Sequence, residues 1–218
     1  MRSLWLLPAP LLPAEIASLH HWLTQTLGAS RAQYGWIDER YPNRQHKTLN
    51  PAGLTAPSIV LVDSDKALSE AILQSAPVTI TQWWQADATS VLPYPAVDVM
   101  ATYDFSLQLC CFSFIDTQAR RDIVDYWRQQ HAPIACDNQT TVAYVQNVVH
   151  TSAPQALTID GWAEEGFPHD CIDNPLRFFN ADSPATLKQH VQNITNSSAK
   201  FIAMDSIFVQ HYSLLRLI

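Results

Sequence analysis

The chain has 218 residues, of which 47% are hydrophobic and 15% charged, and its 20 acidic and 13 basic residues give a formal net charge of −7. This length suits one or two domains, and the composition is that of a chain that buries a core rather than a disordered one. The acidic balance excludes a basic groove for nucleic acid as a global feature. The five glycines include no G-x-G-x-x-G or G-x-x-x-x-G-K-[ST] spacing, which argues against nucleotide chemistry of those two kinds.

Aromatic residues are the most distinctive part of the composition, with seven Trp, seven Tyr and eight Phe. In a chain poor in glycine and charge, they indicate either a lined ligand cavity or a large aromatic packing surface. Sheet packing is favoured over a substrate cage for four of the five Trp of the first half, which are Trp5, Trp36, Trp83 and Trp84.

The first half contains a helical repeat between runs of strand-forming residues. Ile16, Leu19 and Leu23 recur at helical spacing before Gly28, where the helix is expected to end. The predicted strands cover residues 3–7, 32–38, 58–62 and 78–85, and the predicted helices cover residues 13–27 and 66–74. A polar segment, 39–57, separates the second strand from the third. The predicted order is therefore β-α-β-β-α-β.

The second half repeats this order after a linker, 87–99, that contains Pro93 and Pro95. Its first helix is expected to end at His131, because Pro133 follows, and Ser183 with Pro184 begins its second helix. The predicted strands cover residues 104–115, 141–149, 159–167 and 201–217. The predicted helices are 117–131 and a segment after Ser183 that aligns Leu187, Val191 and Ile194 on one face.

Each βαββαβ unit is expected to place two helices on one face of a four-stranded antiparallel sheet and to leave the other face bare. The nearest cover for a bare apolar sheet is the sheet of the other unit. We therefore predict an α+β fold in which tandem ferredoxin-like repeats, 1–95 and 96–218, pair into an α+β barrel. Pairing is expected within one chain, with a homodimer formed beyond it. Pairing of each repeat with a copy in a second chain is the alternative.

Three segments of the second half carry a resemblance to a known family. They are Tyr126-Trp127-Arg128-Gln129-Gln130-His131-Ala132-Pro133 at a helix end, Tyr144-Val145-Gln146-Asn147 in the second strand and Asp160-Gly161-Trp162-Ala163-Glu164 in the third. In this order over residues 104–212, they are similar to the signatures of the EthD-like family of dimeric α+β barrel proteins. The first half matches only in its element order and is interpreted as a degenerate repeat.

The resemblance implies a ferredoxin-like repeat paired into a barrel. Members of this superfamily include cofactor-free lactone isomerases, polyketide cyclases, decarboxylases, quinone-forming monooxygenases and haem-degrading enzymes, and the fold does not choose among them. The chain departs from the family pattern after Glu164, where the family has an apolar residue and Trp before Phe. This chain has Glu165 and Gly166 before Phe167, and Trp162 is the candidate to supply the missing bulk.

His131 is the leading candidate for chemistry. At the end of a helix, where the dipole favours the imidazolium, it is a candidate acid or base near neutral pH, and a structural helix cap is the alternative. Glu164 shares a strand face with Trp162. If that face lines the barrel, Glu164 is a second acid/base or orienting group, and if it faces solvent, Glu164 is a surface residue. Glu165 is expected on the opposite face, as a surface residue.

Five further residues are candidates for the site. Tyr144 or Asn147 is expected to steady a developing oxyanion, although they lie on opposite faces of their strand and pairing within the sheet is the alternative. The candidates for the substrate pocket are Trp162, Trp127 and Asp205. Asp205 stands in an apolar predicted strand and needs a cation or hydroxyl partner if it is buried.

No metal or cofactor is expected, because the eight His show no pairwise ligand spacing. The four Cys are expected to be reduced thiols of a cytoplasmic protein rather than disulfides. The N-terminal segment 1–14 has some features of a secretion signal, but Pro8, Pro10 and Pro13 favour a first strand followed by a turn. No apolar stretch is long enough for a transmembrane helix, and no membrane partner is expected.

Two functions of different classes fit these observations. The first is a cofactor-independent lyase, isomerase or cyclase that moves a proton next to the carbonyl of a small hydrophobic or aromatic metabolite, with His131 as proton carrier and Glu164 assisting. The second is a non-catalytic small-ligand-binding or assembly protein whose barrel is filled by its own aromatic side chains. A haem-binding or oxygen-activating protein is a third interpretation. The expected partner is a small hydrophobic molecule.

Overall fold

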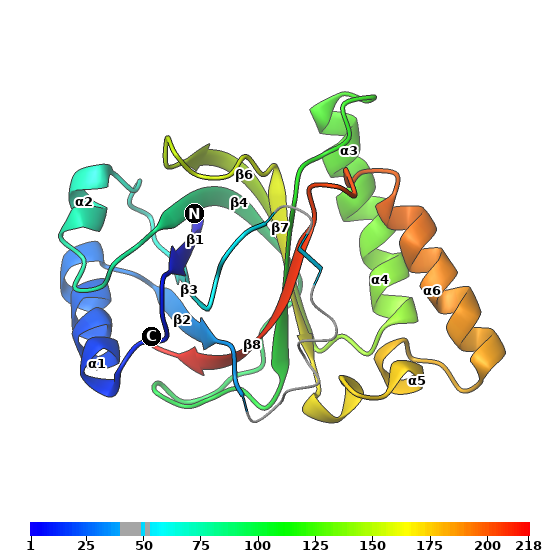
Figure 1. The fold of residues 1–218 in the computed structure, drawn as a ribbon, viewed down its shortest axis with the longest axis horizontal. Helices are drawn as coiled ribbons and strands as arrows, with labels where there is room; N and C mark the ends of the chain where they lie inside the picture. The colour runs from blue at the N-terminus through cyan, green and yellow to red at the C-terminus, as the bar shows by residue number, and fades with distance from the viewer. Residues whose placement is uncertain (40–48, 51–52) are drawn as a thin grey trace.

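The computed structural model describes residues 1–39, 49–50 and 53–218 and contains a closed barrel of eight antiparallel strands (Figure 1). The strands are β1 (Arg2–Leu7), β2 (Arg31–Trp36), β3 (Ser58–Asp63), β4 (Gln82–Leu92), β5 (Ser106–Phe112), β6 (Ala143–Ser152), β7 (Gly161–Phe167) and β8 (Phe208–Arg216). Most of the predicted polar segment 39–57 lies outside the described residues. The predicted α+β class is confirmed.

The order of strands around the barrel shows how the two repeats combine. The sequence β4-β1-β3-β2 is followed by β8-β5-β7-β6, so each repeat forms a sheet of the same ferredoxin-like order. The two sheets join where β2 pairs with β8 and where β4 pairs with β6. The predicted pairing of the two repeats within one chain is therefore confirmed, and the boundary drawn at residue 95 falls between β4 and β5.

Helices cover the outside of the barrel on two opposite sides (Figure 1). One side carries α1 (Pro13–Trp22), its π-helical extension η1 (Leu23–Leu27) and α2 (Glu70–Gln74). The other carries α3 (Arg120–Tyr126), the π-helical turn η3 (Trp127–His131), α4 (Ala132–Asn138), the 3₁₀ turn η4 (His169–Cys171), α5 (Pro175–Phe178) and α6 (Pro184–Ser198). None of the helices in the described part of the chain is long and apolar enough to cross a membrane.

The inside of the barrel is packed with side chains from both repeats. Trp84 from the first repeat and Trp162 and Tyr212 from the second are fully buried there, with Phe105 and Phe208 beside them. These rings belong to one continuous apolar cluster that spans the barrel. Many of the other aromatic residues pack between a sheet and its helices, so the aromatic excess of the sequence is divided between the barrel interior and these outer layers.

Several element boundaries differ from the prediction. The helix predicted over 66–74 forms only over Glu70–Gln74. Strand β4 continues to Leu92, into the predicted linker, because its second half pairs with β6, with Asp87 opposite Val148 and Ser90 opposite Val145. The helix predicted to stop at His131 continues as α4 through Pro133. A π turn makes this possible: the N–H of Ala132 donates to the carbonyl of Trp127, five residues back.

The last predicted strand, 201–217, is too long at its beginning. Strand β8 starts at Phe208, and Phe201 and Ile202 precede a turn rather than continue the strand. Asp205 lies in this turn and is exposed. The expectation that Asp205 stands within an apolar strand is therefore wrong, because the apolar run on either side of it belongs to two separate segments. Asp205 itself does not line the cavity described below, although Met204 and Ile207 do.

Candidate functional site

Strand β7 carries two adjacent acids, one on each face of the sheet. Glu164 is opposite Leu109 of β5 and Val145 of β6 and points into the barrel, whereas Glu165 is opposite Gln108 and Tyr144 and points toward the helices. Successive side chains of a strand alternate in this way. The predicted pairing of Glu164 with Trp162 on one face is confirmed by the hydrogen bond from Trp162 Nε1 to Glu164 Oε1, 3.0 Å long.

Glu164 is held inside the barrel by an arginine of the other repeat. Arg2 donates to it from Nε at 2.9 Å and from Nη2 at 2.6 Å, and both side chains are fully buried. Asn147 Nδ2 donates at 3.1 Å and the Tyr94 hydroxyl at 2.7 Å. Although burial by itself lowers the pKa of Arg2, the carboxylates of Glu164 and Asp63 raise it overall. These contacts occupy both carboxylate oxygens of Glu164 in an ion-paired cluster.

The space available for a ligand near the predicted site lies on the other face of the second sheet. A cavity of about 270 Å³ separates this sheet from the helices that cover it, and we refer to it as the sheet–helix cavity. Its polar wall residues include Gln108, His131, Tyr144 and Glu165, and its apolar wall includes Trp127 and Phe201. The cavity has no Lys or Arg in its described lining.

Glu165 is the acid of this cavity, and the expectation of a surface position for it is wrong. Its side chain is buried because η3, α4 and α6 cover the outer face of β7. Gln108 Nε2 donates to Glu165 Oε2 at 2.7 Å. Burial raises the pKa of Glu165 to about 7, and the hydrogen bond from Gln108 opposes this shift only in part. A carboxyl group in this range is poised to exchange a proton at neutral pH.

The sequence carried one signal that pointed to Glu165. It stands where the family pattern has an apolar residue, which is the composition expected for a covered strand face. Gly166 is the second departure from the family pattern, and Trp162 was expected to supply the bulk that is missing there. A Cβ at Gly166 would lie 2.9 Å from the ring of Phe105. Phe105 therefore fills this part of the barrel, and Trp162 packs elsewhere in the same interior.

His131 lies in the middle of a continuous helical segment and lines the sheet–helix cavity. Its Nδ1 is 2.9 Å from Ser197 Oγ, which is in turn 3.0 Å from the Tyr126 hydroxyl. The imidazole packs edge-on against Phe201, with ring centroids 4.8 Å apart. Burial lowers the pKa of His131 to about 4, so the ring is neutral at pH 7. The expected helix-end imidazolium is wrong, because the helix does not end there and desolvation dominates.

Tyr144 and Asn147 belong to different compartments, as their strand alternation predicted. The Tyr144 oxygen accepts hydrogen bonds from Trp127 Nε1 and Gln146 Nε2, each 3.1 Å long, so its own proton is left for a further partner. Burial raises the pKa of Tyr144, which keeps this hydroxyl protonated. Asn147 instead bonds Glu164 and the carbonyl of Trp162 inside the barrel.

The structure thus divides the predicted site residues into three groups. The sheet–helix cavity brings together His131, Tyr144 and Trp127, to which it adds Glu165. The barrel interior brings together Glu164, Asn147 and Trp162. Asp205 joins neither group. The side chains of Glu164 and His131 therefore do not share a cavity, because they lie on opposite sides of the second sheet.

Potential metal ligands and thiols are dispersed. No group of three or more His, Cys, Asp or Glu side chains is arranged to hold a metal ion in the described ranges 1–39, 49–50 and 53–218. All four cysteines are free, and Cys110 lines the sheet–helix cavity, where burial raises the pKa of its thiol well above the usual value.

Comparison with known proteins adds one finding. A solved structure described as an anthrone oxidase-like protein is similar to this chain, with a TM-score of 0.50 and 8% sequence identity over 98% of this chain and 89% of that one. The chain has the dimeric α+β barrel fold. At this identity the similarity shows the fold alone. No protein-family model matches the sequence, and none of the curated proteins is similar to it.

Proposed function

We propose that this protein is an EthD-like enzyme that transfers a proton next to the carbonyl group of a small, uncharged hydrophobic or aromatic molecule, without a cofactor. The observation that carries the proposal is the buried carboxyl of Glu165 on the wall of the sheet–helix cavity, with a pKa of about 7. A general base works best when its pKa is close to the working pH. Perturbed carboxyl groups in cavities are also frequent at catalytic sites.

The proposed reaction is an enolisation. The ionised Glu165 carboxylate removes a proton from a carbon that the carbonyl acidifies, either next to the carbonyl or conjugated with it through an aromatic ring. The electron pair of the broken C–H bond moves to the carbonyl oxygen. The same carboxyl then returns the proton to a carbon or oxygen atom of the product. Gln108, which donates to Glu165 Oε2 at 2.7 Å, fixes the carboxyl and leaves Oε1 for the substrate.

Two groups in the cavity can donate a hydrogen bond to the carbonyl oxygen of the substrate as it gains negative charge. The hydroxyl of Tyr144 accepts two hydrogen bonds and therefore has its proton available for donation. The contacts of His131 allow one arrangement of protons in which Tyr126 donates to Ser197 and Ser197 donates to His131 Nδ1. In this arrangement the neutral ring carries its proton on Nε2, which can donate to the substrate oxygen. These donors lie among apolar wall residues, where hydrogen bonds to an oxyanion are stronger than in water.

In this proposal Glu165 takes the role of proton carrier that was first predicted for His131, and it also replaces Glu164 as the acid of the site. Glu164 is bound by Nε and Nη2 of Arg2 and is not among the residues that line the cavity with His131. An uncharged substrate fits the cavity because no described Lys or Arg lines it to bind an anion. The apolar wall, including Trp127 and Phe201, favours a ring system.

Anthrone is a suitable probe substrate, since its CH₂ group is acidified by the carbonyl through the aromatic rings and the similar structure is described as anthrone oxidase-like. The test is proton exchange of this CH₂ group in D₂O under nitrogen, followed by NMR. We expect exchange above the buffer rate, with kcat/KM rising with pH through about 7. Glu165→Gln is expected to reduce the enzymatic rate by about 10²-fold or more.

Glu70→Gln, on α2 and far from this cavity in the fold, is the control and should retain full activity.

The alternative function is a non-catalytic ligand-binding protein, which is favoured by the aromatic filling of the barrel. Saturable binding of anthrone with exchange at the buffer rate would support that alternative. A haem or oxygen-activating protein would instead show a visible chromophore or consume dioxygen. We also retain the homodimer as a proposal, which light scattering tests.

A further inference from the structure

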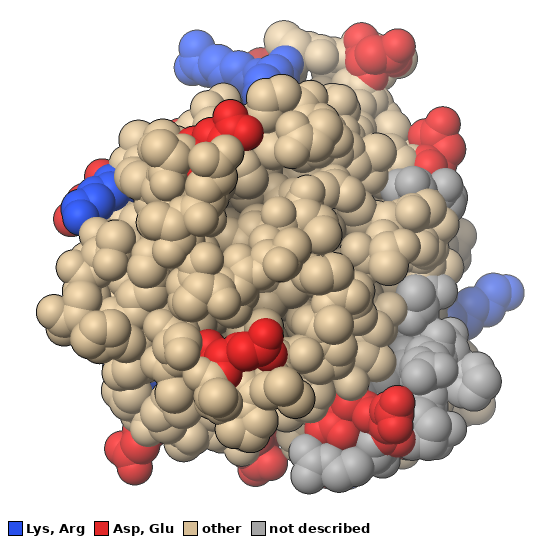
Figure 2. All heavy atoms as spheres, turned by 60° about the vertical axis from the view of Figure 1, so that its left-hand side comes forward, with Lys and Arg blue, Asp and Glu red and all other residues tan. Residues whose placement is uncertain are grey.

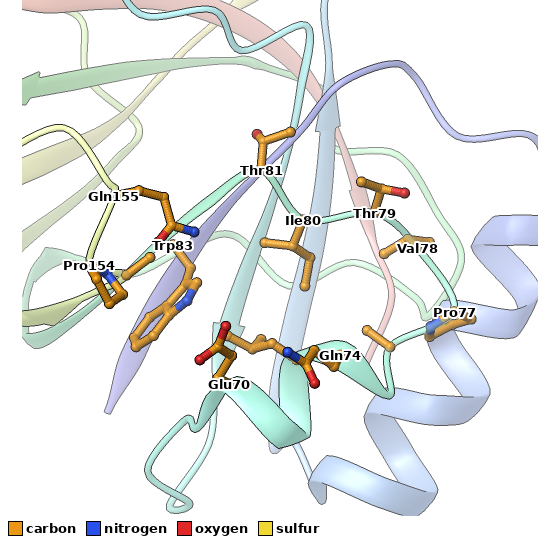
Figure 3. Close-up of a pocket in the computed structure, with 13 residues that line it drawn as sticks. Glu70, Gln74, Pro77, Val78, Thr79, Ile80, Thr81, Trp83, Pro154 and Gln155 are labelled. Atoms are coloured by element: carbon orange, nitrogen blue, oxygen red, sulfur yellow. The ribbon is translucent and has the colours of Figure 1, made fainter.

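A second cleft lies on the first repeat, away from the sheet–helix cavity, and has a volume of about 460 Å³ (Figure 3). It is bounded by α2, by the segment 76–81 that leads into β4, by Trp83 of β4 and by the loop 153–155 after β6. The cleft exists because α2 has only 5 residues, whereas its counterpart in the second repeat, α6, has 15. The short helix leaves the beginning of β4 uncovered.

Trp83 supplies the aromatic wall of this cleft. It is half-buried and packs against the apolar cluster between the first sheet and its helices. Figure 3 shows the carboxylate of Glu70 and the amide of Gln74 projecting from α2 toward the indole, with Pro154 and Gln155 on the opposite side. An indole with an accessible face and a carboxylate across from it is a combination that attracts a cation.

The charge of the cleft also favours a cation. Glu70 is the one charged residue in its described lining, and no Lys, Arg or His side chain lines it. The whole chain carries a formal net charge of −7. Figure 2 shows that the side bearing α1 and α2 is largely uncharged, with most of the visible Lys and Arg near its margin. A cation therefore meets no repulsion at the cleft, and an anion gains no partner there.

We propose that this cleft binds a small organic cation, a quaternary or protonated amine with apolar substituents, between the Trp83 indole and the Glu70 carboxylate. The ammonium group lies against the ring face, Glu70 balances its charge, and Gln74 and Gln155 bind polar atoms of the attached chain. The proposal is independent of the proton-transfer function, because the cleft shares no described lining residue with the sheet–helix cavity.

The test uses choline and its uncharged analogue of the same shape, 3,3-dimethylbutan-1-ol, with sodium chloride added to match ionic strength. The full chain is labelled with 5-fluorotryptophan, and the Trp83 resonance in ¹⁹F NMR is the one that Trp83→Phe removes. We expect choline to shift this resonance saturably, with the analogue binding at least about fivefold more weakly.

The variants separate charge from packing. Glu70→Gln, at an exposed position, should weaken choline binding at least about fivefold without unfolding the chain. The matched control is Glu15→Gln, which removes the first-turn glutamate of α1 and should leave choline binding unchanged. Equal affinity for choline and the analogue would overturn the proposal. The absence of a saturable shift with both choline and benzyltrimethylammonium would also overturn it.

Discussion

Glu164 and Glu165 are neighbours in the chain, yet their carboxyl groups lie on opposite sides of the second sheet. Glu164 is paired with Arg2 inside the barrel at 2.6 Å, while Glu165 has Gln108 as its hydrogen-bond donor at 2.7 Å in the sheet–helix cavity. The first acid is neutralised by a buried cation, and the second is raised in pKa by burial. One strand thus carries a structural acid and a chemically poised acid side by side.

Arg2 is expected to be essential for stability. Arg2→Met leaves the buried carboxylate of Glu164 without its cation, so the free energy of unfolding should fall by about 3–5 kcal/mol. Urea denaturation measures this loss. The double variant Arg2→Met with Glu164→Leu should recover much of it, because both charges are then removed. Arg31→Met is the control: its pair with Asp63 is partly exposed, and its loss should cost at most about 1 kcal/mol.

Glu165 is expected to make the protein less stable as pH rises. In the unfolded chain its carboxyl ionises near the ordinary pKa of 4.5, but in the folded protein only near 7. The folded state binds the proton more tightly in this window, so its contribution is present below about pH 4.5 and is lost as pH rises to about 7, by at most about 3 kcal/mol. Glu165→Gln should remove this slope, and Glu70→Gln should leave it intact. An unchanged slope in Glu165→Gln would contradict the assigned burial.

His131 is expected to make the protein less stable as pH falls. The unfolded chain protonates this ring near 6.5, and the folded protein only near 4. Stability should therefore fall as pH decreases from about 6.5 to 4, by at most about 3 kcal/mol. Thermal unfolding of His131→Gln across this window should lack that loss, and His21→Gln, at an exposed position, is the matched control. A His131 ring that titrates above pH 6 by NMR would refute the prediction.

Gly161 is required for close packing between β7 and β6. A Cβ at this position would lie 2.9 Å from the backbone oxygen of Asn147 and 3.1 Å from the Trp127 ring. Gly161→Ala is therefore expected to destabilise the protein by about 1–3 kcal/mol and to displace Trp127 in the cavity wall. Gly28→Asn is the comparison: Gly28 has a positive φ of 65° that Asn tolerates and open space around it, so the change should be small.

The second repeat is expected to need a partner sheet. Cutting the chain to residues 96–218 removes β2 from the edge of β8 and β4 from the edge of β6. The exposed edges and the apolar inner face should drive this fragment to dimerise or aggregate. Size-exclusion chromatography with light scattering measures its mass, and a stable monomer would show that the second sheet does not depend on the first.

Much of the architecture was predictable because it depends on local patterns. Strand and helix periodicities predicted β-α-β-β-α-β twice, and each sheet with a bare apolar face needs a second sheet to cover it. Alternation along a strand also separated Tyr144 from Asn147 correctly. Element ends were less predictable: Pro133 is a helix breaker by local rules, but a π turn at Trp127–His131 carries the helix past it.

The sequence by itself thus determined the order of elements, the need of each repeat for a partner sheet and the face of each strand on which a side chain lies. Only the tertiary structure decided which side chains and helices contact each face of a strand. Arg2 reaches Glu164 across 162 positions of sequence, and α4 and α6 bury Glu165 against the sheet. The physical reason is that side-chain alternation is a property of a few neighbouring residues, whereas burial, ion pairing and the pKa of a carboxyl depend on groups that folding brings together from distant parts of the chain.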